Sequence, residues 1–216
     1  MLISRKEKVL SAPPVTTEAY SKYDNNKWVF TYSDGTRAFV KGDSPVGNNR
    51  RRNASQRNER AAYLVAKALG FKALVPPTVL YKFRGRVVSV QEWVDGDTAR
   101  ATQSDGILTP PPEIQTFDYI IGNCDRHLSN WMVTRRGFLS HRYVAIDNAY
   151  SFIVGRHPMS PIDFTFKPAW HTLIKNPQHL VKQLTPLIGR VATRELLVRL
   201  QYLADEHARR TANRRG

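Results

Sequence analysis

The sequence predicts an α+β protein of two lobes, a small β-rich N-terminal lobe that contains one helix and a mainly helical C-terminal lobe. Before residue 95, short runs of apolar residues alternate with polar ones, which is the period of β-strands. Later runs mostly have the spacing of three and four residues that is typical of helices. The stretch 95–112 lies between them and has the composition of a linker. We therefore expect lobes at 1–94 and 95–216.

The N-terminal lobe is predicted to contain two strand hairpins and one helix. Asp34 and Gly35 predict the first turn, and Arg84 and Gly85 predict the second. Gly70 stands where the C-terminal cap of the helix belongs. The expected elements are strands at 27–33 and 37–41, a helix at 56–69, and strands at 78–83 and 86–94.

The C-terminal lobe is predicted to contain three helices and one small hairpin. Pro112 is suited to the first turn of a helix, because proline lacks the N–H that this turn leaves unpaired. A second pair of strands surrounds Gly137. The expected elements are a helix from Pro112, strands at 131–135 and 142–146, and helices at 177–187 and 193–208.

The charge balance is strongly basic, with 33 Lys and Arg against 18 Asp and Glu and a net charge of +15. This excess favours polyanionic partners such as nucleic acid, ATP or acidic protein surfaces. A solvated basic surface without a specific partner is an equally good explanation. The clustered basic residues are Arg50, Arg51 and Arg52 with Arg57 and Arg60, and the C-terminal Arg209, Arg210, Arg214 and Arg215.

The single cysteine, Cys124, excludes an internal disulfide and is typical of proteins in a reducing cytoplasm. We expect its thiol to be a small buried filler. No apolar run approaches the roughly 20 residues that span a bilayer, and the N-terminus lacks an apolar signal region. The sequence therefore predicts a cytoplasmic protein without a membrane span.

The stretch NCDRHLSNWMV, residues 123–133, places many polar groups between two apolar runs. A hydrophobic core would exclude these groups, because each buried polar group needs a partner. Other polar residues also interrupt apolar patterns: Lys41 ends a predicted strand, Glu59 lies in the first turn of a predicted helix, and Asp147 ends another strand. Taken singly, these three have structural explanations as an edge-strand charge, a helix-dipole acid and a turn former.

Taken in order, the residues fit phosphoryl transfer. This chemistry needs a strand lysine on the nucleotide phosphates, a helix glutamate that holds the lysine, and a loop aspartate beside the attacking hydroxyl. It also needs an asparagine and a second aspartate for magnesium. The sequence supplies these residue types in this order, as Lys41, Glu59, Asp125, Asn130 and Asp147. Asp125 and Asn130 also have the five-residue spacing of a kinase catalytic loop.

The segments IGNCDRHLSNWMV and YVAIDNAYSF resemble the catalytic and metal-binding loops of the phosphoinositide 3-/4-kinase superfamily. They are similar also to the loops of HipA-type bacterial protein serine/threonine kinases. The string NERAAYLVAKALGFKALVPPTVLY with VVSVQEWVDG resembles the helix, strand and hinge that precede those loops. The resemblance covers residues 28–152 and implies a two-lobed protein-kinase-like fold that uses ATP and Mg²⁺.

For the nucleotide, the resemblance implies that Lys41 contacts the phosphates and that Glu59 pairs with it. The implied hinge, which would read adenine through backbone groups, consists of Gln91, Glu92, Trp93 and Val94. The sequence has no G-x-G-x-x-G loop. The phosphate clamp could therefore be Ser33 to Thr36 or the segment from Gly42 to Ser55.

For the transfer step, the resemblance implies that Asp125 orients or deprotonates the acceptor hydroxyl, with His127 as a competing base. Asn130 and Asp147 would hold magnesium. Arg126 is expected to brace the loop rather than react, because a guanidinium cannot give up its proton.

The acceptor stays open among several classes. The stretch after Asp147 lacks the dense basic cluster expected where a lipid kinase holds an inositol phosphate, which favours a protein serine or threonine. Transfer to a lipid or small molecule, transfer of AMP, and an inactive kinase-like protein that binds nucleic acid are the alternatives. A protein substrate is the expected partner, nucleic acid is a further one through the basic surface, and the oligomeric state is open.

Overall fold

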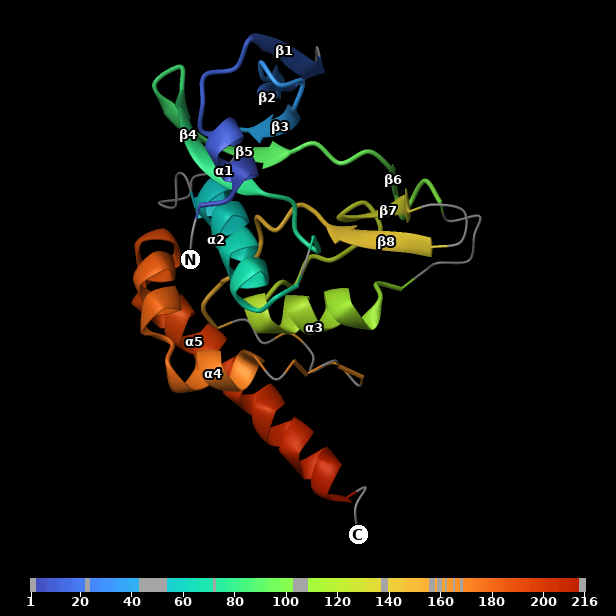
Figure 1. Cartoon of the computed structure of the whole chain (residues 1–216), viewed down its shortest axis with the longest axis vertical. Helices are drawn as coiled ribbons and strands as arrows, with labels where there is room; N and C mark the ends of the chain where they lie inside the picture. Colours follow the sequence, from blue (N-terminus) through green and yellow to red (C-terminus); the bar gives the residue numbers. More distant parts are fainter. Residues whose placement is uncertain are drawn as a thin grey trace.

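A computed structural model describes residues 3–21, 24–42, 54–71, 73–102, 109–136, 140–155, 158, 161, 163–164, 166–167 and 169–213. The predicted α+β class is confirmed, with an antiparallel sheet in the N-terminal part and helices in the C-terminal part. In Figure 1 the first sheet lies at one end, α4 and α5 lie towards the other, and the second sheet and α3 lie between them. No helix in these described ranges is long and apolar enough to cross a membrane.

The N-terminal sheet has five antiparallel strands in the order β1-β2-β3-β5-β4. Along β3, Ala38 and Val40 are buried in an apolar cluster on one face, so Phe39 and Lys41 project from the other face. The strand bounds are β1 Thr16–Ser21, β2 Asp24–Thr31, β3 Arg37–Lys41, β4 Thr78–Phe83 and β5 Arg86–Glu92.

Two helices accompany this sheet, α1 (Arg5–Leu10) and α2 (Ala54–Ala68). The predicted C-terminal cap of α2 is present: Gly70 has φ +67°, and the Phe71 N–H donates to the Ala66 carbonyl at 2.9 Å. A side chain at Gly70 would disfavour this left-handed conformation.

The second sheet has the order β6-β7-β8, and some of its apolar side chains belong to the same core as those of α2, α3 and α5. In chain order, the last strand of the first sheet ends at Glu92 and the first strand of the second sheet begins at Asp97. The predicted boundary between the lobes, after residue 94, lies between these two residues. The elements of the C-terminal part are β6 Asp97–Thr98, α3 Pro112–Ile121, β7 Trp131–Arg136, β8 Ser140–Ala145, α4 Ala169–Lys175 and α5 Gln178–Asn213.

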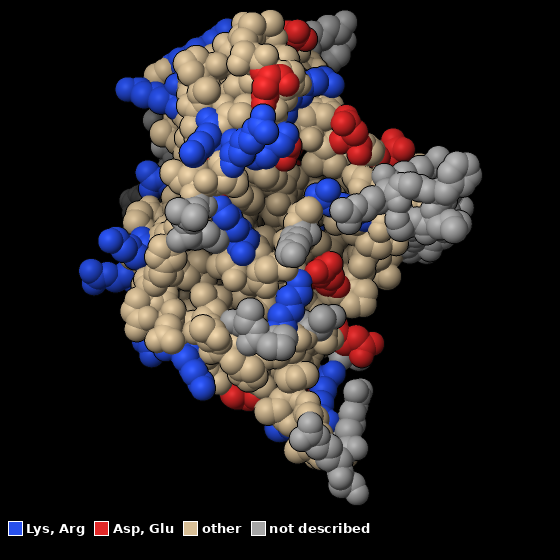
Figure 2. Space-filling view, viewed as in Figure 1, with Lys and Arg blue, Asp and Glu red and all other residues tan. Residues whose placement is uncertain are grey.

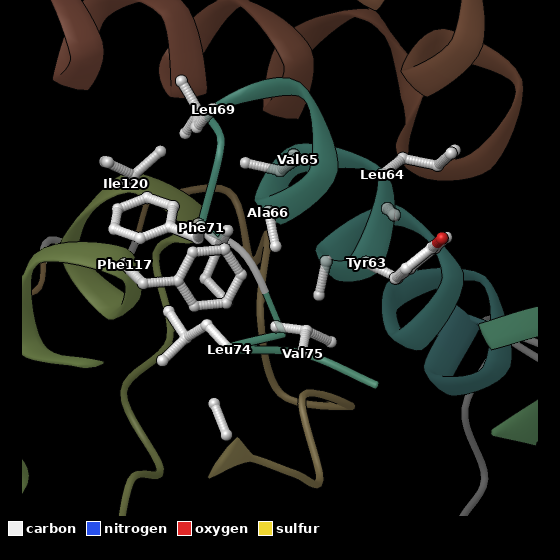
Figure 3. Packing of buried hydrophobic residues seen from close by; sticks show 14 of the residues in the cluster. Tyr63, Leu64, Val65, Ala66, Leu69, Phe71, Leu74, Val75, Phe117 and Ile120 are labelled. Atoms are coloured by element: carbon white, nitrogen blue, oxygen red, sulfur yellow. The ribbon is translucent and has the colours of Figure 1, made fainter. Parts of the chain in front are cut away.

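The larger apolar core joins α2 to α3 and α5 (Figure 3). Phe71, just after α2, lies edge-on to Phe117 of α3, with ring centroids 5.6 Å apart. The Trp170 ring lies 5.4 Å from Phe71, and its Nε1 donates to the Leu69 carbonyl at 2.8 Å. This core therefore fixes α2, which carries Glu59, against the C-terminal helices.

Several elements differ from the sequence-based expectation. Four elements were not predicted: the helices α1 and α4 and the strands β1 and β6. The two helices expected at 177–187 and 193–208 are present as the two parts of α5, which is interrupted by a kink at the non-helical Gly189. The expectation of a buried Cys124 is wrong, because this residue is exposed at the end of α3. Gly137 lies outside the described residues.

Candidate active site

Lys41 forms ion pairs with two acidic side chains from distant parts of the chain. Its Nζ lies 2.7 Å from Glu59 Oε1 on α2 and 3.2 Å from Asp147 Oδ1 after β8. Burial alone would lower the pKa of Lys41, but the two carboxylates outweigh burial and raise the pKa above its ordinary value. The lysine therefore stays charged at neutral pH.

Glu59 and Asp147 differ in their access to solvent. The Glu59 side chain is only 3% exposed, whereas the Asp147 side chain is 45% exposed. The second oxygen of Glu59 accepts a hydrogen bond from the Asn148 backbone N–H at 3.1 Å. Glu59 is thus a fixed internal partner, whereas the Asp147 carboxylate is half-exposed to solvent.

The loop with Asp125 and Asn130 begins where α3 ends at Gly122. This glycine has φ +66°, and an added Cβ would lie 3.0 Å from Arg199 Nη2, so both conformation and space favour glycine. The Asn123 N–H then donates to the Asp118 carbonyl at 2.9 Å, which closes the helix end.

Within the loop, Asp125 and Asn130 are held close together. The Asn130 Nδ2 donates to the Asp125 backbone carbonyl at 2.8 Å, and the Asp125 N–H donates to Asn123 Oδ1 at 3.0 Å. Among the described residues, no hydrogen bond or ion pair to the Asp125 carboxylate is found, so it stays available for an acceptor. The Ile146 N–H donates to the Asn130 carbonyl at 3.0 Å, which joins this loop to the segment that carries Asp147.

Arg126 acts as the expected brace. Its Nε and Nη2 donate to both oxygens of Asp118 at 2.9 and 2.7 Å, which is a bidentate pair. The same guanidinium donates to the carbonyls of Asn130 and Ile146 and to Asn148 Oδ1. Arg126 therefore finds partners on α3 and in the two loops around it, which explains how its guanidinium can lie between apolar runs.

His127 is exposed and lies in a shallow hollow with Arg100, Leu128 and Ser129. Its Nδ1 accepts a hydrogen bond from the Ser129 N–H at 3.2 Å. This bond engages Nδ1 of His127, whereas the Asp125 carboxylate has no partner among the described residues, which favours Asp125 as the base.

The predicted hinge is only partly free to recognise a base. The Glu92 N–H donates to the Pro77 carbonyl at 2.8 Å, and the Trp93 N–H donates to the Arg37 carbonyl at 2.9 Å. The Gln91 side chain is buried and donates to Thr78 Oγ1. Within the described part of the chain, no such partner is found for the Val94 N–H, which leaves this amide unpaired.

Sequence reasoning missed an aromatic cluster beside Lys41. The Tyr20 ring lies 4.8 Å from Phe39, the Phe39 ring lies 6.4 Å from Trp93, and Arg37 stacks 4.4 Å above Trp93. Phe39 is two residues before Lys41 and shares its face of the sheet. A planar base could stack on these rings. Tyr20 was missed because β1 was not predicted.

The register of the sheet corrects one alternative for the phosphate clamp. Lys27 pairs with Lys41, whereas Thr31 pairs with Arg37, so the turn Ser33 to Thr36 lies at the opposite end of β3 from Lys41. The paired ends of β1 and β2, Ser21 and Asp24, lie at the Lys41 end instead. Residues 22 and 23 lie outside the described residues. So does most of the other predicted phosphate clamp, residues 43–53, which include Ser44.

Asn130 and Asp147 are suited to a hard divalent cation. Asn130 donates through Nδ2, so its amide oxygen is the atom left to bind a metal, and Asp147 adds a half-exposed carboxylate. Among the described residues, no three His, Cys, Asp or Glu side chains form a metal cluster. This small set fits magnesium, which typically binds one or two carboxylates together with substrate phosphates and water.

Several arginines of the predicted basic clusters have acidic partners. Arg60 donates to Glu7 Oε1 at 2.8 Å and to the Thr78 carbonyl, so it is not an available surface charge. Arg209 and Arg210 both form ion pairs with Glu206. Arg50 to Arg52, Arg214 and Arg215 lie outside the described residues. Figure 2 shows Lys and Arg scattered over this face rather than in one continuous patch.

Comparisons with known proteins bear on the fold and on the C-terminal part of the chain. Residues 113–214 match the family described as phosphatidylinositol 3- and 4-kinase. No curated protein matches the chain. Among solved structures, the proinflammatory kinase CtkA of Helicobacter pylori is 14% identical, with a TM-score of 0.50, and the match covers 85% of this chain and 88% of that chain.

A second solved structure is the Golgi casein kinase with Mn/ADP bound. It is 15% identical, has a TM-score of 0.53, and the match covers 89% of this chain and 72% of that chain. At this identity the likeness concerns the fold. The chain therefore has a protein-kinase-like fold, and its C-terminal part is similar to the phosphatidylinositol 3- and 4-kinases.

Proposed function

We propose that this chain is an ATP- and magnesium-dependent kinase that transfers phosphate to a serine or threonine of a protein. The observation that carries the proposal is the position of Lys41, whose Nζ contacts Glu59 and Asp147 at 2.7 and 3.2 Å. This arrangement brings together the strand lysine, the helix glutamate and the metal-binding aspartate that phosphoryl transfer needs.

In this proposal, Lys41 binds the nucleotide phosphates through its ammonium group, and Glu59 orients it. Asn130 Oδ1 and the Asp147 carboxylate would hold the metal, which when bound neutralises charge on the phosphates. The rings of Tyr20 and Phe39 would contact the base.

Asp125 would orient the acceptor hydroxyl and accept its proton. Its backbone is fixed by Asn123 and Asn130, while its carboxylate is free of partners among the described residues. The hydroxyl oxygen then attacks the terminal phosphorus, the bond from that phosphorus to the bridging oxygen breaks, and ADP leaves.

Two observations support a protein acceptor. Residues 147–155 contain no Lys or Arg, although an inositol phosphate headgroup would need cations near the metal-binding aspartate. One protein of the same fold is named a casein kinase, and casein is a protein. A lipid acceptor is the second candidate, because residues 113–214 match a phosphatidylinositol kinase family.

The test is incubation of the enzyme with ATP, magnesium and two acceptors, which are casein and vesicles that contain phosphatidylinositol. The masses of the intact enzyme, of casein and of the extracted phosphatidylinositol are then measured. Phosphate on casein or on the enzyme itself is the expected result. Phosphate on the lipid alone would favour the second candidate, and an AMP adduct would show a different transfer. No adduct on any acceptor, together with no ATP binding, would contradict the proposal.

A further inference from the structure

Asn148 connects three parts of the candidate site that are far apart in the sequence. Its backbone N–H donates to Glu59 Oε2 on α2 at 3.1 Å. Its side-chain Oδ1 accepts from Arg126 Nη2 in the loop after α3 at 2.7 Å. The residue is fully buried, with a relative exposure of 0%, and directly follows Asp147. Asn148 thus has the contacts of an internal connector rather than of a ligand-binding group.

Arg126 contacts both neighbours of Asp147 in the chain. It donates to the Ile146 carbonyl at 2.5 Å and to Asn148 Oδ1 at 2.7 Å. Asp147 itself has φ +53°, in the left-handed region that side chains other than glycine rarely adopt. The two flanking hydrogen bonds therefore hold Asp147 in a backbone conformation that it would not prefer, and this conformation sets the direction of its carboxylate.

The same residue connects Asp147 with the Lys41–Glu59 pair. Glu59 uses Oε1 for Lys41 and Oε2 for the Asn148 N–H, so its two oxygens join the strand lysine to the metal-binding segment. If the Asn148 side chain loses Arg126, the backbone at 147–148 is free to turn. Both the Asp147 carboxylate and the hydrogen bond to Glu59 would then shift.

We propose that Asn148 is a positioning residue that keeps Asp147 directed at the metal and couples it to the Lys41–Glu59 pair. The proposal rests on the proposed function, because it assigns a metal-binding role to Asp147. Asn148 contacts neither nucleotide nor acceptor in this account. Its loss should therefore weaken metal-dependent nucleotide binding more than acceptor binding.

The test compares three variants with the wild type. Asn148→Leu removes the Oδ1 acceptor, Asn148→Asp keeps an oxygen there for Arg126, and Thr116→Val is the control. Thr116 is equally buried, and among the described residues its hydroxyl donates only to the Pro112 carbonyl within α3, far along the chain from Asp147. The measurement is the magnesium concentration that gives half of the thermal stabilisation by ATP.

We expect Asn148→Leu to raise this concentration about 10–100-fold, the usual effect of losing a residue that orients a metal ligand. Asn148→Asp should restore most of the affinity, and Thr116→Val should leave it unchanged even where it lowers the Tm. Equal magnesium requirements for wild type and Asn148→Leu would overturn the proposal. So would a loss in Thr116→Val as large as that in Asn148→Leu.

A second measurement does not depend on whether Asn148→Leu folds. The rate of amide hydrogen exchange in residues 146–151 is compared between the wild type and Glu59→Gln. This substitution replaces the charged acceptor of the Asn148 N–H with a neutral one. Faster exchange in Glu59→Gln is expected, and unchanged exchange would exclude the coupling. If the wild type binds no ATP with magnesium, the proposed function fails, while the exchange experiment still decides whether the connection exists.

Discussion

Glu59 is the residue on which the candidate site converges, because its two carboxylate oxygens have different partners. One oxygen fixes the Lys41 ammonium group, and the other accepts from the backbone beside Asp147. The side chain is almost completely buried, so an unpaired Glu59 would be costly. The pair with Lys41 should therefore show energetic coupling rather than two independent contributions.

We predict that Lys41→Met and Glu59→Gln each reduce turnover, and that the double variant loses less than the sum of the two single losses. The difference should be about 0.5–3 kcal/mol in apparent activation free energy, as for residues in direct contact. Lys167 and Glu113 form a more exposed ion pair at 3.4 Å and are the control, for which turnover should hardly change. Strict additivity for Lys41 and Glu59 would contradict a functional pair.

Residues of the candidate site could be proposed where a polar residue interrupts an apolar pattern, as Lys41 and Asp147 do at strand ends. Asn148 could not be found this way. Its role depends on one backbone N–H and one side-chain oxygen that reach α2 and Arg126 in space. Phe39 also gave no signal, because alternation cannot tell which face of a strand meets the core. Tyr20 was missed because β1 was not predicted.

At the scale of elements, the helix α1 connects α2 with the hinge. Its Glu7 lies 2.8 Å from Arg60 Nη1 and 2.5 Å from Lys67 Nζ, both on α2. The neighbouring Lys6 lies 2.7 Å from Glu92 in the hinge strand. Because Arg60 directly follows Glu59, α1 helps to hold α2 in the position where Glu59 meets Lys41.

The Glu7 contacts predict a pH dependence of stability. Burial would raise the pKa of Glu7, but Lys67, the Ser4 N–H and Arg60 lower it to about 2 from 4.5. The stabilisation is therefore complete above pH 4.5 and is lost as the pH falls towards 2. Glu7→Gln should destabilise the protein by about 1–3 kcal/mol at neutral pH, allowing for partial screening, and should lose less further stability on acidification.

The measurement is the free energy of unfolding by denaturant between pH 7 and the acid limit of folding. Glu18→Gln is the matched control, because Glu18 is exposed on β1. This control should unfold like the wild type at every pH. Parallel pH curves for wild type and Glu7→Gln would contradict the assignment of the ion pairs.

The elements that sequence patterns missed are short or poorly patterned. The six-residue helix α1 is defined by its capping box between Ser4 and Glu7 rather than by apolar periodicity. Most of β1 is exposed on both faces at the edge of the sheet, so its apolar alternation is weak. By contrast, α2, α3 and the β4–β5 hairpin have strong periods and clear turn residues, and they were predicted close to their observed bounds.

At the scale of the molecule, the two aspartates would have different roles at one site in the proposed function. Asp147 would act through the metal, because its carboxylate lies beside Lys41. Asp125 would act on the acceptor hydroxyl, because its backbone is fixed and its carboxylate is free of partners among the described residues. A protein that only shared the fold would not need this division.

The most direct test measures ATP–magnesium binding and phosphate transfer in the same preparations of wild type, Asp147→Asn and Asp125→Ala. Asp147→Asn should lose metal-dependent stabilisation by ATP and transfer together. Asp125→Ala should keep the stabilisation while its transfer falls by about 10²–10⁴-fold, and His127→Ala should show a milder loss. Full transfer activity in both aspartate variants would contradict the account.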